Sequence, residues 1–303
     1  MQKKEKLVCA LLLLGALLCM AALLLSLCRG RADGLTSLLL TTHRIWEKPF
    51  AFGGFHLSCL LLCVIFATFF GIFGARWGRG SYDRLVFLFG ISFLWLELYK
   101  QLYSFLVLWN GRYDWGIFPF QFCSLPIYFC LIVPFLREGV IKETVYRFLA
   151  LFGTMGGCLV MAYPRFYAEA ALCIHSMLWH TLMICMGVFL LYARGYGRRW
   201  GREIGSASTV FLLSLTLATA LNLGLTPVAN DSPNPLNLFY MNPYQSTYFL
   251  VVKDVWAAWG WGAAMLCYVI LFVFVGATAV FFAISLTRLV PLLWMRAKKD
   301  EKK

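Results

Sequence analysis

The sequence has few acidic residues and no long polar region. Acidic residues number 14 in a chain of 303, and charged residues of both signs make up 14% of it. The most polar stretch, residues 226–262, is short and rich in proline, asparagine and aromatic residues. This composition leaves no room for a sizeable soluble domain. We therefore expect a single integral membrane domain over residues 1–303.

The cysteine and histidine spacings typical of metal sites are also missing. The chain has eleven cysteines and four histidines, but no two cysteines are separated by two residues. Cys59 and Cys63 are four apart on one predicted helix face, where packing is their simplest role. Most other cysteines lie in apolar segments and behave there as small hydrophobic residues. A zinc site is therefore not expected, and we predict neither a metal nor a cofactor.

Long apolar runs are what the sequence does contain. Hydrophobic residues make up 61% of the chain, and its mean hydropathy is +0.74. Apolar runs of about eighteen residues or more are the signature of helices that cross a bilayer. The predicted fold is all-α, a polytopic transmembrane helix bundle of about eight spans, namely seven plus an N-terminal anchor helix. The expected spans are 7–28, 55–74, 85–109, 118–136, 146–163, 171–193, 207–226 and 262–287.

The basic residues predict the orientation of these spans. The net charge of +13 does not indicate nucleic acid, because the chain has no basic domain to bind it. Most lysines and arginines instead fall in the N-terminal tail, in every second loop and in a basic tail over residues 288–303. Positive residues concentrate on the cytoplasmic side of a membrane. We therefore expect a multi-pass protein of the plasma membrane with both termini in the cytoplasm.

Ionisable residues inside a span mark the third predicted helix. Glu97, Lys100, Gln101 and Ser104 lie three or four residues apart, which places them on one helix face. A charged group in a span is costly and usually faces the bundle interior. Two interpretations stay open. A Glu97–Lys100 pair ties this helix to its neighbours, or one of the two orients a catalytic group or a lipid head group.

Two histidines lie in the predicted span over residues 171–193. His175 and His180 are five residues apart, which separates them by about 140° on a helix. His180 shares its face with small and polar residues and is the better catalytic candidate. His175 is shallow and shares its face with Leu178 and Trp179, so we expect it to reach the membrane interface. A histidine that is simply hydrogen-bonded inside the bundle is the alternative role for His180.

Cys123 lies where a polar loop meets an apolar segment, between Pro119 and Pro126. A cysteine paired with a histidine forms a thiolate that attacks an acyl carbon. Gln121 and Ser124 lie next to it and are the candidate oxyanion donors. A disulfide between Cys123 and Cys173 is the competing possibility.

Further polar side chains are predicted on the same, outer side of the bundle. Asn222 lies near the outer end of its span, and the loop that follows supplies Asn237 and Tyr240. We expect these groups and Cys123 to form a site that opens toward the outer leaflet. Substrate-binding candidates in that site are Glu97, Lys100, Gln121, Ser124, His175, Asn222, Asn237 and Tyr240.

Five short segments resemble the YwaF-like membrane proteins, a family that includes animal transmembrane protein 164. They are ELYKQ at 97–101, PFQFCSLPIYF at 119–129, GTMGGCLVMAYP at 153–164, HTLMICMGVFLLYA at 180–193 and NLFYMNP at 237–243. The resemblance covers a core of about residues 85–260. Gln121 is a departure, because bacterial relatives often have a histidine at that place.

The resemblance implies an acyltransferase that moves an acyl chain from a phospholipid to a lysophospholipid through a cysteine–histidine pair. Carried over by motif, the pair is Cys123 and His180, and membrane phospholipids are the substrate. A protein that binds or transports lipids or small solutes without catalysis remains the alternative. A lipid thioesterase or hydrolase, with water as the acceptor, is a third possibility.

Overall fold

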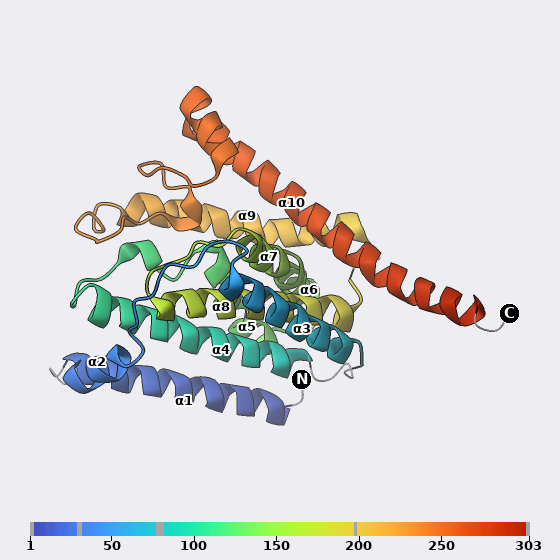
Figure 1. Cartoon of the computed structure of the whole chain (residues 1–303), viewed down its shortest axis with the longest axis horizontal. Helices are drawn as coiled ribbons and strands as arrows, with labels where there is room; N and C mark the ends of the chain where they lie inside the picture. The colour runs from blue at the N-terminus through green and yellow to red at the C-terminus, as the bar shows by residue number, and fades with distance from the viewer. Residues whose placement is uncertain (1–2, 29–31, 77–81, 197–198, 301–303) are drawn as a thin grey trace.

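The computed structural model describes residues 3–28, 32–76, 82–196 and 199–300, and Figure 1 shows their arrangement. The described residues form helices and no strand, apart from an isolated bridge between Ile45 and Glu169. The α-helices are α1 (Lys3–Cys28), α2 (Ala32–Leu40), α3 (Gly54–Arg76), α4 (Tyr82–Tyr103), α5 (Leu125–Ile132), α6 (Val140–Phe148), α7 (Thr154–Ala162), α8 (Ala170–Arg194), α9 (Trp200–Leu225) and α10 (Leu250–Asp300). The predicted all-α class is confirmed.

Six segments are long and apolar enough to cross a membrane within the described residues. They are Gly54–Gly74, Tyr82–Leu108, Val140–Ala162, Ala170–Arg194, Trp200–Leu225 and Leu250–Gly276. Two of them contain a π-helical turn: η1 (Ser104–Leu108) follows α4 and ends its segment, and η5 (Leu149–Gly153) joins α6 to α7. In α1, Leu7–Ala22 is a shorter apolar helix. The chain is thus a multi-pass membrane protein, as the apolar runs predict.

The predicted span over residues 118–136 is shorter than expected. The apolar helix there runs from Phe122 to Phe135 and consists of η3 (Phe122–Ser124), α5 and η4 (Val133–Phe135). Its length of about 21 Å, at 1.5 Å per residue, falls short of a hydrocarbon core of about 30 Å. Proline has no N–H to donate and interrupts a regular helix. Pro126 stands in the first turn of α5 and Pro134 in that of η4, where each marks a helix start.

Helix α8 lies at the centre of the bundle and packs against α3, α4 and α7. Helices α7 and α8 approach each other closely because glycines, which have no side chain, lie at their contact. A Cβ added at Gly157 would lie 2.8 Å from the backbone oxygen of His180, and one added at Gly187 would lie 1.9 Å from Oγ1 of Thr154. Helix α10 instead crosses the bundle obliquely and extends beyond it (Figure 1). Much of the surface of α3 and of Leu250–Gly276 in α10 is exposed and apolar, as lipid contact requires.

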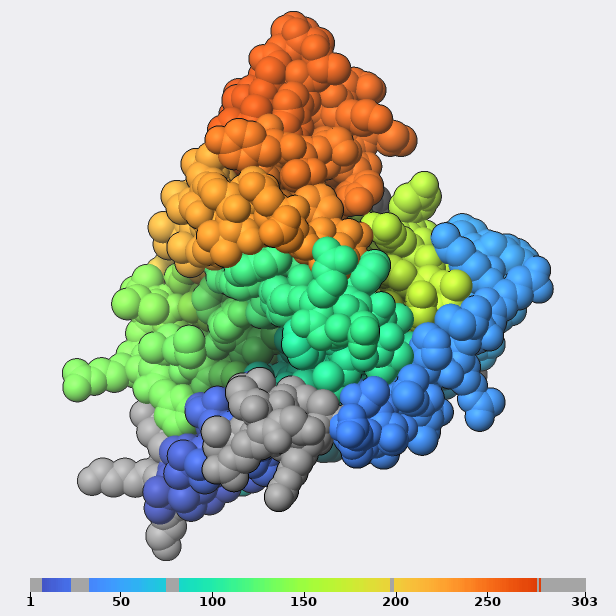
Figure 2. All heavy atoms as spheres, turned by 90° about the vertical axis from the view of Figure 1, so that its left-hand side faces the viewer, coloured from blue at the N-terminus to red at the C-terminus, as the bar shows by residue number. Residues whose placement is uncertain are grey.

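Four connecting segments, 41–53, 109–121, 163–169 and 226–249, gather at one end of the bundle, which we call the loop end. Hydrogen bonds join them, since Trp46 N donates to Ala168 O (3.1 Å) and Trp115 N donates to Oγ of Ser232 (2.8 Å). Figure 2 looks onto this end, where the blue, teal and orange segments meet.

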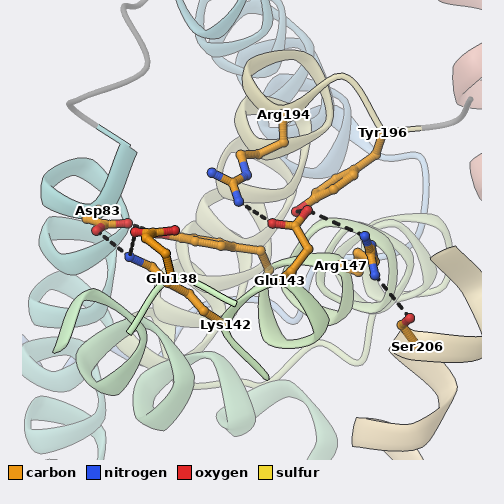
Figure 3. Close-up of polar contacts among 9 residues, drawn as sticks. Asp83, Glu138, Lys142, Glu143, Arg147, Arg194, Tyr196 and Ser206 are labelled. Atoms are coloured by element: carbon orange, nitrogen blue, oxygen red, sulfur yellow. Dashed lines mark hydrogen bonds and ion pairs between the residues drawn. The ribbon is translucent and has the colours of Figure 1, made fainter. Parts of the chain in front are cut away.

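The opposite end, which we call the charged end, holds a cluster of ion pairs from α4, α6, α8 and the turn before α6, and Ser206 on α9 accepts a hydrogen bond from Arg147 (3.1 Å). Lys142 Nζ lies 2.6 Å from Oδ2 of Asp83 and 2.6 Å from Oε1 of Glu138, and Arg194 pairs with Glu143. The cluster is drawn in Figure 3 with the labelled residues Asp83, Glu138, Lys142, Glu143, Arg147, Arg194, Tyr196 and Ser206. Helix α1 begins and α10 ends on this side (Figure 1).

Candidate functional site

Cys123 lies at the loop end, in the short helical turn η3 that leads into α5. Its side chain is half-buried, and its backbone oxygen accepts a hydrogen bond from Nε1 of Trp179 on α8 (3.0 Å). The hydroxyl of Ser124, which is buried, lies beside the sulfur. The indole of Trp179 thus ties the cysteine to the central helix. Sequence reasoning placed Trp179 on the face of His175 and did not identify this contact.

The competing disulfide does not form. Cys123 and Cys173 are both free thiols. Cys173 donates to Tyr167 O (3.1 Å) and accepts from Tyr167 N (3.0 Å), so its sulfur serves the turn before α8. Cys123 therefore retains a free thiol.

His180, on α8, has an unusual hydrogen-bonding state. Its Nδ1 lies 2.7 Å from the carbonyl oxygen of Ser176, one helical turn earlier. A carbonyl oxygen only accepts, so Nδ1 carries the proton and Nε2 is the unprotonated nitrogen of the neutral ring. Nε2 is buried and has no hydrogen-bond partner among the described residues. A buried polar atom without a hydrogen-bond partner costs free energy, so most such atoms in proteins have a partner. Nε2 can therefore accept a hydrogen bond or a proton from a ligand or a nearby side chain.

No hydrogen bond joins Cys123 to His180 in the described part of the chain, since Nε2 of the ring is unpartnered. The two residues nevertheless share a neighbour. Lys100 lies within electrostatic range of the cysteine sulfur and of the imidazole, and its Nζ lies 5.8 Å from the centre of the Trp179 ring. The structure thus brings Cys123, His180 and Lys100 to the same region of the bundle.

Glu97 and Lys100 form the ion pair that their spacing suggests. Lys100 Nζ lies 2.9 Å from Oε2 of Glu97, and the other carboxylate oxygen accepts from Gln101 Nε2 (2.7 Å). Gln101 also donates to Ile117 O (2.8 Å), which joins α4 to the loop before Cys123. Burial, and secondarily the charge of Glu97, raises the pKa of Tyr113 in this loop to about 12. Its phenol therefore stays protonated near neutral pH.

The structure corrects the expected position of His175. The residue is buried, with 8% of its surface exposed, whereas a position at the membrane interface requires an exposed side chain. Helix α4 covers it, since Nε2 lies 3.0 Å from Leu96 O and the ring stacks against Tyr99 with centroids 6.4 Å apart. Trp179 covers another part of the ring, at 5.6 Å. Helix spacing gives the angle between two side chains, but the packing of the neighbouring helix decides whether either is exposed.

Gln121 holds the loop after α9 in place. Its Nε2 donates to Asn237 O (3.0 Å), and its Oε1 accepts from Phe239 N (2.8 Å). These contacts stabilise the turn η6 (Leu238–Tyr240), in which Phe239 and Tyr240 both have φ of 56°. A positive φ is uncommon for residues other than glycine and persists when surrounding contacts enforce it. The side-chain amide of Gln121 is therefore engaged in folding the loop.

Two asparagines of the expected site serve the same loop. Asn222 is fully buried, donates to Leu238 O (3.1 Å) and accepts from Leu238 N (2.8 Å). Asn237 donates to Ser246 O (3.0 Å) and accepts from Asn242 N (3.0 Å). Their amides are directed at the backbone. Sequence position indicated that these residues lie near one another, but not that the loop itself uses their hydrogen bonds.

Tyr240 differs from the asparagines because its side chain is 37% exposed. Its ring meets Tyr248 edge-on with centroids 5.0 Å apart, and it lies within electrostatic range of Cys123. Tyr240 is therefore the loop residue best placed to contact a ligand at Cys123. In the described residues, no group of three or more histidine, cysteine or acidic side chains is arranged to hold a metal ion.

Comparison with known proteins gives one family assignment. No curated protein and no solved structure matches the chain. The model of the TMEM164 family matches residues 51–286, well over half of the chain. The match extends beyond the 85–260 core that carries the short motifs, and it includes α3 and much of α10. The chain therefore belongs to the TMEM164 family.

Proposed function

We propose that this protein is an integral membrane acyltransferase that moves a fatty acyl chain between phospholipids through Cys123 and His180. The observation that carries the proposal is the state of the His180 ring. Its Nδ1 is held by Ser176 O, and its buried Nε2 has no partner. A general base needs this tautomer, because the unprotonated nitrogen must face the proton that it removes. Catalytic hydrogen bonds often tighten only once substrate is bound.

In the first half of the reaction, Nε2 of His180 takes the proton from the thiol of Cys123. The thiolate attacks the ester carbonyl carbon of a phospholipid, so a C–S bond forms and the C–O bond breaks. The leaving lysophospholipid oxygen receives the proton from the imidazolium. The positive charge of Lys100 favours the thiolate, whereas burial and the carboxylate of Glu97 oppose it, so the proton transfer to His180 is what generates the nucleophile.

In the second half, the hydroxyl of an acceptor lysophospholipid gives its proton to His180 and attacks the thioester. A C–O bond forms, the C–S bond breaks, and the sulfur recovers its proton. The developing oxyanion needs a donor. We assign this role to the hydroxyl of Ser124, because the amide of Gln121 already serves the loop.

The test is to trap the acyl-enzyme. Purified protein is incubated with a phospholipid that carries an alkyne-tagged acyl chain, and a hydroxylamine-sensitive adduct is measured. We expect the adduct on the wild-type chain and on a Cys158→Ala control, whose cysteine is exposed on α7, but not on Cys123→Ala. His180→Gln should slow adduct formation by about 10²- to 10⁴-fold, the usual contribution of a general base.

His175→Gln is the matched histidine control, since that ring already has a backbone partner. Equal rates for the two histidine variants would contradict the role of His180. A missing adduct on the wild-type chain, with lipid still bound by Cys123→Ala, would favour the non-catalytic lipid-binding protein. Release of the tagged chain as a free acid in the presence of lysophospholipid would identify a hydrolase.

The location is also part of the proposal. The concentration of lysine and arginine residues near the charged end supports cytoplasmic termini in the plasma membrane. In that orientation the loop end, with Cys123, faces the outer leaflet.

A further inference from the structure

An apolar crevice opens between α7 and α10. Its volume is about 160 Å³, and its exposed lining is entirely apolar. The lining includes Leu159, Val252, Tyr268, Leu271, Phe272 and Val275. Both helices belong to membrane-spanning segments, so hydrocarbon surrounds the opening. Apolar cavities of roughly this size exclude water and accept apolar ligands. The chemistry of this crevice fits a hydrocarbon chain.

Aromatic contacts connect the crevice to Cys123. Phe272, in the lining, lies 5.4 Å from the ring of Phe122, the residue before the cysteine. Tyr268, also in the lining, lies within electrostatic range of the sulfur. A chain in the crevice therefore has one end close to the thiol.

A second connection leads from the crevice to the surface of the loop end. Phe249 lines the crevice and meets Tyr240 edge-on, with ring centroids 6.0 Å apart. Tyr240 in turn meets Tyr248 at 5.0 Å. The guanidinium of Arg165 lies 5.4 Å from the ring of Tyr248. A continuous row of aromatic side chains thus ends at an arginine.

Arg165 is an exposed cation in the segment between α7 and α8. Its contacts are aromatic, with Tyr248 and, at 5.9 Å, with Tyr167. No carboxylate lies within ion-pair distance of it among the described residues. A guanidinium matches phosphate in charge and in the geometry of its donors, and tyrosine hydroxyls donate to the same oxygens. This group of residues, Arg165, Tyr167, Tyr240 and Tyr248, is called the arginine–tyrosine cluster below.

We propose that one glycerophospholipid occupies both features, with its phosphate on the arginine–tyrosine cluster and one acyl chain in the apolar crevice. Cys123 lies within electrostatic range of two cluster members, Tyr167 and Tyr240, and of Tyr268 in the crevice. Because Phe272 of the crevice packs against Phe122, the residue before Cys123, the ester group that joins head group and chain is then placed in the region of the cysteine. This inference deepens the proposed function by assigning where the phosphate and one acyl chain of the phospholipid bind, and its catalytic meaning rests on that function.

The chain half of the proposal is tested by photo-crosslinking. The full chain, with Cys123→Ala to remove the chemistry, is reconstituted with phosphatidylcholine that carries a diazirine in one acyl chain. Labelled peptides are identified by mass spectrometry. We expect label on the crevice segments around Leu159 and Leu271, and Leu271→Trp should remove it by filling the space.

Ile270→Trp is the matched control, since Ile270 is 58% exposed and does not line the crevice. It should leave the crevice label unchanged. Equal loss of label in the two tryptophan variants, or label spread evenly over the exposed faces of α3 and α10, would overturn the assignment of the chain.

The phosphate half is tested with the same probe and Arg165→Gln. Loss of one charge-assisted hydrogen bond should weaken phospholipid binding about tenfold. Lys48→Gln removes one positive charge from an exposed residue of the loop end and should have no such effect. Unlabelled phosphatidylcholine should compete better than a diacylglycerol with the same chains. Equal competition by the two lipids, or equal binding by the two glutamine variants, would overturn the assignment of the phosphate.

These measurements separate the inference from the proposed function. Binding is read in the Cys123→Ala variant, which forms no thioester. One outcome is photo-label in the crevice that depends on Arg165, with no thioester adduct on the wild-type chain. This outcome would support the lipid site and reject the acyltransferase. A wild-type adduct without crevice label would reject the lipid site alone.

Discussion

Replacing Lys142 by methionine should destabilise the charged end severely. The Lys142 side chain is 2% exposed and makes two ion pairs of 2.6 Å, with Asp83 and Glu138. Figure 3 shows Asp83 beside Lys142. Asp83 is itself buried and also accepts a hydrogen bond from Tyr146. Methionine keeps the length of the side chain but leaves Asp83 without a cation. Breaking a buried pair in this way costs about 3–5 kcal/mol.

Glu138→Gln provides the internal comparison. Its side chain is 69% exposed, so its pair with the same ammonium is worth no more than about 1 kcal/mol. The double variant Lys142→Met with Asp83→Asn removes both buried charges while an acceptor remains for Tyr146. Replacing a whole buried pair is often nearly neutral, so this variant should recover at least about 2 kcal/mol of the loss.

The assay is the free energy of unfolding in detergent micelles, from reversible denaturation followed by circular dichroism. We expect the order of stability wild type, Glu138→Gln, the double variant and then Lys142→Met. The reasoning fails if Lys142→Met and Glu138→Gln lie within about 1 kcal/mol of each other, because the pair to Asp83 would then contribute no more than an exposed one.

Two further predictions concern close packing and the loop end. Gly187→Ala places a methyl group 1.9 Å from Oγ1 of Thr154 and should destabilise the protein by about 1–3 kcal/mol. The methyl group of Gly205→Ala meets nothing within 4 Å, so this variant should stabilise α9 by about 0.5–1 kcal/mol. Thermal unfolding of the two variants checks both signs. Asn222→Ala leaves the buried N–H of Leu238 unpaired, whereas the Leu238 carbonyl keeps the hydrogen bond from Met241 N (3.1 Å), so the change should cost about 1–3 kcal/mol. We expect faster proteolysis of the loop over residues 226–249, and unchanged proteolysis would show that this amide does not hold the loop.

Local spacing predicted those features that depend on one helix alone. The apolar runs marked the six long spans, because a span must be apolar over the full thickness of the bilayer whatever it packs against. The three-residue spacing of Glu97 and Lys100 predicted their ion pair, because one turn of a helix brings such residues together. The prolines of the span over residues 118–136 indicated a kink or a shorter helix, and in the structure Pro126 and Pro134 start short helices.

The partners of polar residues could not be predicted in this way. Gln121, Asn222 and Asn237 were expected to bind substrate, and each is instead directed at the backbone of one loop. Those partners lie far away in the sequence or depend on a turn with positive φ, which no local pattern marks. The same holds for two other features. Trp179 contacts Cys123 from a different helix, and the row of aromatic side chains that ends at Arg165 joins several segments of the chain.

The sequence by itself determined that this chain is a helical membrane protein with a cysteine and a histidine near one end of its bundle. Hydropathy and spacing suffice for this, because the bilayer imposes the same length and polarity on every span. Only the tertiary structure decided that the Nε2 of His180 is buried without a partner, that His175 is covered by α4, and that the loop amides are occupied. These outcomes depend on which neighbour supplies a donor or an acceptor, and neighbours are fixed by the packing of the whole bundle.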